Sequence, residues 1–223
     1  KDLNLGIIGM GYVGLPLASE FAKKRNVIGF DLNKNKVLQI LKKKIRFKVT
    51  TNMKLLKNCK TIIVAVPTPI NKSKKPNLKL LKKACIDIGK NISRDTLVVF
   101  ESTVYPGCTE EFCMPLISKL SRLKINKDIF FGYSPERINP GDKKHSLLKI
   151  NKLVSGSNKQ TTSRIKNLYE EILRNKVFVT DTIKIAEAAK IIENTQRDIN
   201  IALINEFAMI LNKLKIDTKK VIR

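Results

Sequence analysis

Short apolar runs alternate along this chain with stretches in which apolar residues recur every three or four positions. The runs predict β-strands at residues 5–8, 27–30, 61–66, 96–100, 129–132, 153–155 and 177–179. The periodic stretches predict helices at residues 17–22, 34–43, 77–92, 110–120 and 160–173. This alternation is typical of an α/β fold, so we expect a doubly wound parallel sheet with helices on both faces.

The last part of the chain predicts one long helix, from about Ile183 to Leu214, without Pro or Gly. At about 100° per residue, one side of this helix is apolar and includes Ile185, Ile192, Ile199, Leu203, Phe207, Ile210 and Leu214. The nearly opposite side is polar and includes Glu187, Lys190, Asn194, Arg197 and Asn205. A polar helix face is usually solvated, but the lysine and the amides could instead line a site, and the spacing alone does not decide.

A glycine motif connects the first predicted strand to the first predicted helix. Gly9, Gly11 and Gly14 form a Gly-x-Gly-x-x-Gly turn, which permits a tight turn, close approach to a pyrophosphate, and close packing of helix on strand. The helix N-terminus offers unpaired N–H groups to the phosphates. Asp31 ends the second predicted strand, about 20 residues further on, where a carboxylate accepts hydrogen bonds from a ribose. We therefore predict a Rossmann-type domain that binds NAD in preference to NADP.

Composition limits the classes of protein that fit. The 223 residues, of which 43% are hydrophobic, can form one substantial domain, or one domain and part of another. No apolar run approaches the roughly 20 residues needed to span a bilayer, and no secretory signal pattern begins the chain. Four cysteines without a C-x-x-C pair, and a single histidine, argue against structural zinc or a disulfide framework. We expect a cytoplasmic protein without a metal site or a membrane partner.

The formal charge of +25 raises the alternative of nucleic-acid binding. Only 9 of the 44 basic residues are Arg, the lysines are scattered over most segments, and aromatic residues make up just 6%. Base readout favours Arg, and single-strand binding favours interleaved aromatic residues. We interpret the abundance of Lys, Asn and Ile as the product of an AT-rich coding sequence. We expect no nucleic-acid partner, although the charge can attract anionic substrates.

Five blocks of residues follow one another in a fixed order, at 9–16, 66–69, 101–107, 133–142 and 186–198. Together they resemble the UDP-glucose/GDP-mannose dehydrogenase family over nearly the whole chain. Within the family, Ser-Pro-Glu-Arg-Ile-Asn-Pro-Gly at 134–141 is similar to the branch that oxidises UDP-N-acetylglucosamine or UDP-N-acetylgalactosamine, of the Vi-antigen type. The resemblance implies an NAD-binding Rossmann-like domain over residues 1–181. Over residues 182–223 it implies a long central helix, which begins a dimerisation and substrate region.

The chemistry that the resemblance implies is oxidation of the C6 alcohol of a UDP-sugar to a carboxylate, with two NAD molecules used in turn. A base or an ordered water takes the hydroxyl proton in the first oxidation. A cysteine thiolate then captures the aldehyde, and the resulting thioester is hydrolysed. The resemblance thus implies an NAD-dependent enzyme that forms surface-polysaccharide precursors and dimerises through the long helix.

The resemblance also implies roles for particular residues. Lys190 and Asn194, four positions apart on one helical face, would stabilise the oxyanion at C6. Thr103 and Glu136 would hold a water or transfer a proton. The implied cofactor-binding residues are Gly9, Gly11, Tyr12, Val13, Gly14, Asp31, Lys36, Pro67, Thr68 and Thr103. The implied substrate-binding residues are Glu136, Arg137, Lys190, Asn194 and Arg197.

The chain departs from the family pattern in three respects, and its one histidine is interpreted separately. Pro140 stands where the UDP-glucose branch has a second glutamate, so that residue's water-activating role is not carried over. The segment near residues 45–47 is short, either because the chain is abbreviated or because residues are omitted. His145 is expected to be an exposed loop residue. The family's catalytic cysteine and C-terminal UDP-binding domain are not among residues 1–223, either because the chain is abbreviated or because residues are omitted. The cysteines present are expected to be inert packed thiols: Cys59, Cys85, Cys108 and Cys113.

Three hypotheses follow. The first is the NAD-binding portion of a UDP-N-acetylhexosamine 6-dehydrogenase, with the C4 epimer of the sugar left open. The second, motivated by the absent cysteine, is a noncatalytic remnant that binds NAD or dimerises. The third, motivated by charge alone, is a nucleic-acid-binding Rossmann domain. Under the first hypothesis, residues 1–223 alone are not expected to complete the four-electron oxidation.

Overall fold

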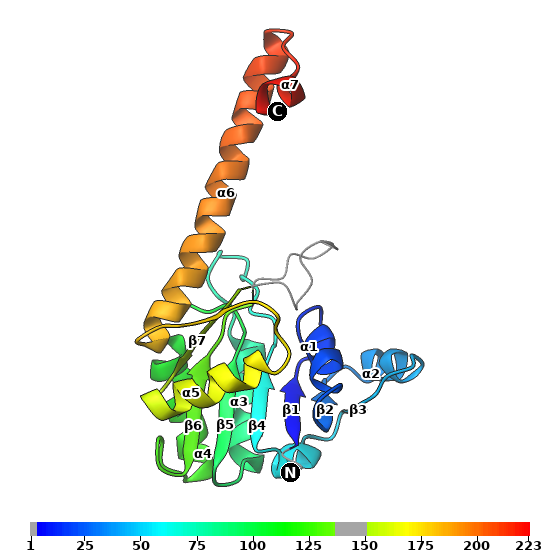
Figure 1. Cartoon of the computed structure of the whole chain (residues 1–223), viewed down its shortest axis with the longest axis vertical. Helices are drawn as coiled ribbons and strands as arrows, with labels where there is room; N and C mark the ends of the chain where they lie inside the picture. The colour runs from blue at the N-terminus through cyan, green and yellow to red at the C-terminus, as the bar shows by residue number, and fades with distance from the viewer. Residues whose placement is uncertain (1–3, 137–150) are drawn as a thin grey trace.

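The computed structural model describes residues 4–136 and 151–223, which form an α/β body and a long helix that projects from it (Figure 1). The described strands form one sheet in the order β3-β2-β1-β4-β5-β6-β7-β8. The strands are β1 (Leu5–Ile8), β2 (Val27–Phe30), β3 (Lys48–Thr50), β4 (Thr61–Val64), β5 (Thr96–Phe100), β6 (Ile129–Tyr133), β7 (Lys152–Gly156) and β8 (Val177–Val179). The predicted α/β fold is confirmed, and so are these positions, apart from β3.

The α-helices of the described residues are α1 (Gly14–Phe21), α2 (Lys34–Leu41), α3 (Lys79–Asn91), α4 (Met114–Ser121), α5 (Lys159–Glu170), α6 (Ile183–Lys213) and α7 (Thr218–Ile222). A 3₁₀ helix, η1 (Met53–Asn58), precedes β4, and a π-helical turn, η2 (Thr109–Cys113), leads into α4. Asparagine side chains cap α2 and α5, because Asn33 and Asn158 accept hydrogen bonds from N–H groups of the first turn.

The sheet is mixed. From β3 to β6 all neighbouring strands are parallel. β7 runs antiparallel to β6, with Gly132 opposite Gly156, and β8 is parallel to β7. The expected parallel order therefore fails at the β6–β7 pair. Parallel neighbours need a crossover connection, usually a helix, and α5 supplies it between β7 and β8, whereas the sequence pattern predicts no helix between β6 and β7.

Strand β3 is absent from the predicted strands. It has three residues and pairs only with β2, at the edge of the sheet. Of these residues only Val49 is buried. A short edge strand of this kind contains no apolar run, so the pattern of hydrophobic residues does not predict it.

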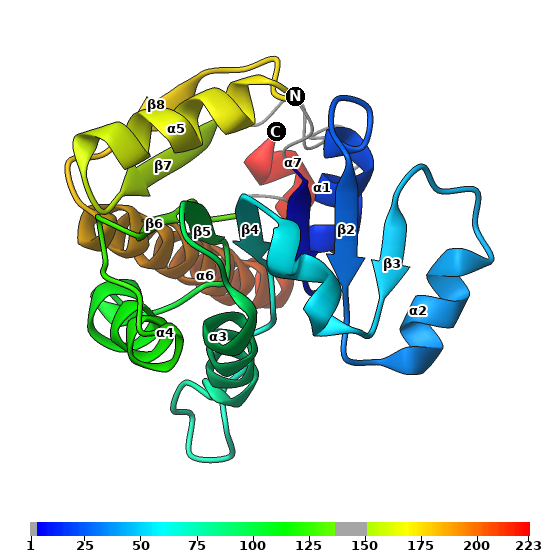
Figure 2. The same cartoon turned by 90° about the horizontal axis from the view of Figure 1, so that it is seen from below.

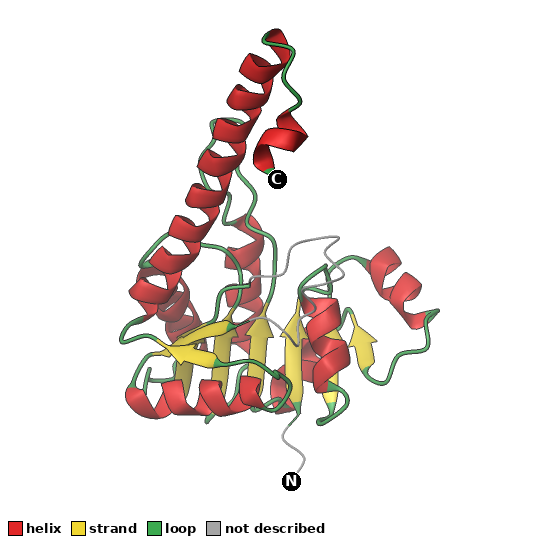
Figure 3. Ribbon diagram, turned by 45° about the horizontal axis from the view of Figure 1, so that its top comes forward, coloured by secondary structure: helices red, strands yellow, loops and turns green. Residues whose placement is uncertain are grey.

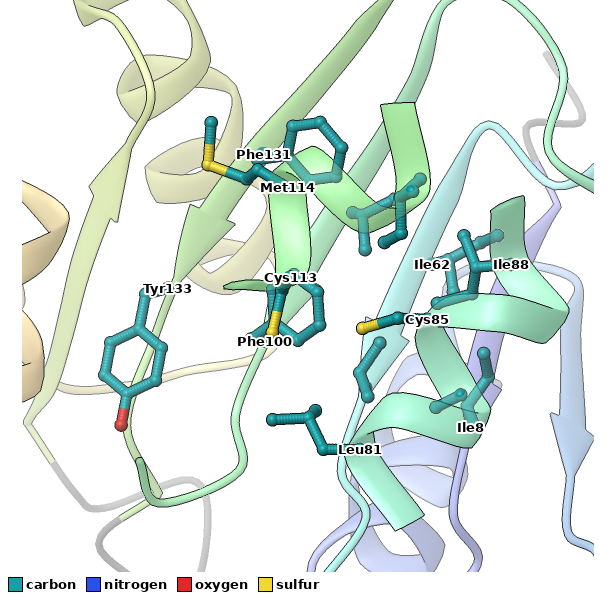
Figure 4. Close-up of a cluster of buried hydrophobic side chains, with 14 of the residues drawn as sticks. Ile8, Ile62, Leu81, Cys85, Ile88, Phe100, Cys113, Met114, Phe131 and Tyr133 are labelled. Carbon is teal, nitrogen blue, oxygen red and sulfur yellow. The ribbon is translucent and has the colours of Figure 1, made fainter. Parts of the chain in front are cut away.

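Two apolar cores lie on opposite faces of the sheet, because successive residues of a strand point to opposite faces. Ile62 and Val64 of β4 belong to the core that includes residues of α3 and α4, whereas Ile63 belongs to the core that includes residues of α1 and α5. Figure 4 shows the first core, where Cys85 of α3 lies near Phe100 of β5. Figures 2 and 3 show helices on both faces of the sheet. Burial on both faces explains the continuous apolar strands.

Helix α6 extends far beyond the body (Figure 1). Its buried residues all lie between Ile183 and Lys190, and among them Glu187 is fully buried and Lys190 is 8% exposed. On the apolar side, by contrast, Ile192 is 68% and Ile199 is 60% exposed. A solvated polar face is therefore wrong for the first turns of α6, where it is the polar side that packs on the body. Among the described helices, α6 included, none is both long and apolar enough to cross a membrane.

Candidate functional site

A cleft of about 630 Å³ lies at the carboxyl ends of the central strands. It is lined by residues that directly follow β1, β2, β4 and β5, among them Gly9, Asp31, Ala65 and Glu101. The order of these strands, β2-β1-β4-β5, places the chain crossover between β1 and β4. Open α/β sheets bind ligands at such a point.

The three glycines of the turn have different structural surroundings. Gly9 has φ of +95°, and a Cβ there would lie 2.6 Å from the Ala65 carbonyl oxygen. A Cβ on Gly14 would lie 1.9 Å from the Gly9 carbonyl oxygen. A Cβ on Gly11 would meet nothing within 4 Å. The fold itself therefore requires Gly9 and Gly14, whereas Gly11 leaves open space above the N-terminus of α1, which no side chain caps.

Asp31 is held rigidly at the edge of the cleft. Its Oδ2 accepts hydrogen bonds from the Met10 N–H at 2.9 Å and from Lys36 Nζ at 2.8 Å, and its Oδ1 accepts one from the Asn33 N–H at 2.9 Å. Burial acts to raise the pKa of Asp31, but these hydrogen bonds outweigh it and the pKa is lowered. The group is therefore a carboxylate at neutral pH. Since a carboxylate has about four acceptor positions, Asp31 can still accept a ribose hydroxyl.

The loops after β4 and β5 are tied to each other. The Ser102 hydroxyl donates to the Val66 carbonyl oxygen at 2.7 Å, and the Thr68 hydroxyl donates to the Thr103 carbonyl oxygen. Pro67, Thr68 and Thr103 all line the cleft. The two loops are thus fastened to each other, and Thr103 lines the same cleft as the glycine turn.

Helix α6 is anchored to the loop after β5 by a buried carboxylate. Glu187 accepts the Gly107 N–H at 2.5 Å and the Thr109 N–H at 2.9 Å. Burial raises the pKa of Glu187, although these donors oppose the change. The anchor fixes the start of α6 relative to the loop that contains Thr103.

The substrate-binding candidates are brought together only in part. Glu136 and Asn194 both line the cleft. Lys190 is not among its lining residues; its Nζ lies 3.6 Å from Glu193 Oε2, and burial lowers its pKa. Arg197, also outside the lining, donates to Glu193 at 3.0 Å. Arg137 lies outside the described residues, as does His145.

The cofactor-binding candidates fall together more completely. The candidates that line the cleft are Gly9, Gly11, Tyr12, Val13, Asp31, Lys36, Pro67, Thr68 and Thr103. Gly14 is not among the lining residues and is buried at the start of α1. The four cysteines are free and buried, as expected of packed thiols. The hydrogen-bond donors and acceptors placed in the cleft fit NAD, while the roles of the individual residues stay predictions.

A buried polar cluster was not predicted. Glu101 stands in one of the five blocks but received no role, and it lines the cleft. It contacts Lys152, the first residue of β7, and Tyr169 of α5. A lysine at the start of an apolar run gives no sign from sequence that its ammonium is buried. Only the pairing of distant elements reveals the cluster.

The cleft, the glycine turn and the carboxylate at the end of β2 define a dinucleotide-binding protein of the Rossmann class. The model of the NAD-binding domain of the UDP-glucose/GDP-mannose dehydrogenase family matches residues 40–173, and the model of the family's central domain matches residues 184–223. The chain therefore belongs to the UDP-glucose/GDP-mannose dehydrogenase family and contains its NAD-binding domain.

Similar proteins agree with this assignment. UDP-N-acetyl-D-glucosamine 6-dehydrogenases from Salmonella typhi and Pseudomonas aeruginosa are each 48% identical to the chain, over 100% of it and 56% of their own length. The solved structure of a UDP-D-ManNAc dehydrogenase from Pyrococcus horikoshii gives a TM-score of 0.90 at 29% identity, over 98% of this chain and 56% of that one. The chain spans about half the length of the relatives it matches.

Proposed function

We propose that the protein uses NAD to oxidise the C6 alcohol of a UDP-N-acetylhexosamine to the uronic acid, a precursor for surface polysaccharide. UDP-N-acetyl-D-glucosamine is the first candidate, because two relatives of that name are 48% identical to the chain. The observation that carries the proposal is that the NAD-binding candidates other than Gly14, with Thr103 among them, share one cleft with Glu136 and Asn194.

The proposed roles follow from position in the cleft. NAD, when bound, accepts the hydride that the alcohol loses. Gly11 and the uncapped N-terminus of α1 receive the pyrophosphate, and Asp31 holds the ribose. Thr103 and Glu136 lie where a hydroxyl proton can be removed, directly or through a water.

Oxyanion stabilisation is proposed for α6. Asn194, which lines the cleft, donates through its amide to the oxygen at C6, and Lys190 is the second donor. The lowered pKa of Lys190 reflects its burial first, with Arg197 acting in the same direction. A desolvated ammonium interacts more strongly with a developing negative charge than a solvated one does.

A homodimer through α6 is part of the proposal. The exposed apolar residues of α6 include Ile192, Ile199, Leu203 and Phe207. Helix α6 projects from the body in Figure 1. A contiguous exposed apolar surface of this kind is typical of a protein interface. The second subunit would cover this apolar side of α6, which lies opposite Glu187 and Lys190.

The test is a panel of UDP-sugars with the protein expressed from its natural reading frame, in which NADH formation is followed by absorbance and the product by mass spectrometry. We expect oxidation of a UDP-N-acetylhexosamine and not of UDP-glucose. Residues 1–223 alone are expected to bind NAD and to form no uronic acid, because none of their cysteines matches the family nucleophile. NAD binding without oxidation of any sugar by the full reading frame would contradict the proposal and favour a noncatalytic NAD-binding protein.

A further inference from the structure

Apart from Glu136, the members of a buried polar cluster at the wall of the cleft have no part in the roles proposed above. Glu101 follows β5, Lys152 begins β7, Tyr169 belongs to α5, and Glu136 follows β6. Glu101 is 2% exposed, Lys152 is 1% exposed and Tyr169 is fully buried. Elements distant in sequence thus converge to enclose several ionisable groups at the wall of the cleft.

One ammonium group serves two carboxylates in this cluster. Lys152 Nζ lies 3.1 Å from Glu101 Oε1 and 3.5 Å from Glu136 Oε2. The Tyr169 hydroxyl donates a hydrogen bond to the same Oε1 of Glu101, and Lys152 Nζ lies 4.9 Å from the centroid of the Tyr169 ring. Glu101 Oε2 is buried and has no hydrogen-bond partner within the described part of the chain. Both glutamates line the cleft.

The ionisable groups of the cluster shift one another's pKa. Burial raises the pKa of Glu101 to about 7, and the Glu136 charge adds to this, although Lys152 opposes it. Burial alone would lower the pKa of Lys152, but the two glutamates outweigh burial and the pKa is raised. The lysine therefore stays charged, and Glu101 is the carboxylate whose raised pKa lets it bind a proton near neutral pH.

Two other ionisable groups face the cluster. Tyr133 of β6 is near enough to be affected by Glu101, and burial raises its pKa, so it is neutral at neutral pH. Lys190 of α6 is near enough to be affected by Glu136. Neither group makes a hydrogen bond to Glu101 among the described contacts. Among the described residues, Lys152 and Tyr169 contact the Glu101 carboxylate directly.

We infer that Glu101, Lys152 and Glu136 act as one proton-accepting unit, in which Lys152 positions both carboxylates at the cleft and the buried Glu101 accommodates a single proton. The inference rests on the proposed dehydrogenase function. As the alcohol loses its hydride, the O–H bond breaks, its electron pair forms the second C–O bond, and the proton passes to the carboxylate pair. Glu101 and Lys152 are thus positioning residues for Glu136, and the pair titrates as a unit.

A binding measurement tests the inference without a sugar substrate. Calorimetry of NAD⁺ binding near neutral pH, in buffers of different ionisation enthalpy, counts the protons released. The positive nicotinamide ring, bound in a cleft that Glu101 lines, favours the ionised carboxylates, so we expect wild-type protein to release a fraction of a proton. Glu101→Gln should reduce this release to zero within error.

Two variants that each remove one tyrosine hydroxyl, Tyr169→Phe and Tyr133→Phe, provide a matched comparison. Tyr169→Phe removes a hydrogen bond that lowers the pKa of Glu101. We expect the pH at which proton release is half-maximal to move up by about one unit, since a net hydrogen bond changes an equilibrium constant roughly tenfold. Tyr133→Phe deletes an equally buried hydroxyl that makes no hydrogen bond to the cluster, so its curve should overlay that of the wild type. If Glu101→Gln fails to fold, the Tyr169→Phe shift decides the question.

Turnover distinguishes positioning from a merely structural role. In the full reading frame, Tyr169→Phe should shift the pH profile of kcat/KM for sugar oxidation upward, with an unchanged Kd for NAD. Unchanged proton release and an unchanged pH profile in folded Glu101→Gln would overturn the inference while leaving the dehydrogenase proposal intact. Failure of wild-type protein to bind NAD would overturn both.

Discussion

The glycine turn offers a paired test of folding against cofactor binding. Gly11 and Gly14 belong to one motif, but a Cβ on Gly11 meets nothing within 4 Å, whereas a Cβ on Gly14 would lie 1.9 Å from the Gly9 carbonyl oxygen. Gly11→Ala should therefore leave the fold intact, and Gly14→Ala should damage it. The motif alone does not distinguish the two positions, so the prediction depends on the structure.

The sizes of the two effects follow from these contacts. Replacing a glycine by alanine where the backbone allows it stabilises a protein by about 0.4–1 kcal/mol. Forcing a methyl group into packed structure costs about 1–3 kcal/mol, and at Gly14 the obstructing atom belongs to the backbone. For NAD binding, a methyl at Gly11 would enter the path of the pyrophosphate. The loss of one charge-assisted hydrogen bond, about 1.5–3 kcal/mol, weakens binding roughly 10- to 150-fold.

The assays are thermal or urea unfolding and calorimetric titration with NAD. Gly11→Ala should unfold at or slightly above the wild-type midpoint and bind NAD at least tenfold more weakly, and Gly11→Val should bind none. Gly14→Ala should unfold earlier. Wild-type NAD affinity in a well-folded Gly11→Ala protein would refute the assignment of the glycine turn as the pyrophosphate site.

Four further predictions test other parts of the molecule. Asp31→Ala should weaken NAD binding and reduce the preference over NADP, measured by calorimetry with both cofactors; equal affinities in the wild type would contradict the ribose assignment. Lys190→Ala should lower turnover in the full reading frame by about 10²–10³ with little change in NAD affinity, and turnover within twofold of wild type would remove Lys190 from the site. Ile199→Lys should convert the proposed dimer to monomer in sedimentation experiments, and an unchanged sedimentation coefficient would contradict a dimer through this face of α6. Because the folded state raises the pKa of Glu101 from 4.5 to about 7, it binds that proton more tightly than the unfolded chain does. The free energy of unfolding should therefore fall, relative to Glu101→Gln, as pH rises through this window, and then stay level; a constant difference across the same pH range would show that Glu101 keeps an ordinary pKa.

The sequence predicted those features that depend on neighbouring residues. Strands β1, β2 and β5 were predicted at their observed bounds because a strand buried on both faces is a continuous apolar run. Strand β8 was also predicted at its bounds from its apolar run, although only Val177 of its residues is buried. The glycine turn and Asp31 were predicted because a tight turn and a strand end restrict residue type locally. Their meeting in one cleft followed from the rule for the carboxyl ends of parallel strands.

The tertiary structure decided what depends on contacts between distant segments. The periodicity of α6 separates its polar and apolar sides but does not tell which side packs on the body. That Glu187 is buried follows from N–H donors in the loop after β5, and the apolar side is left exposed. Lys152 likewise contacts Glu101 only because β7 pairs antiparallel with β6. Local patterns constrain each residue's conformation, whereas the partner of a buried charge is set by how strands and helices pair across the chain.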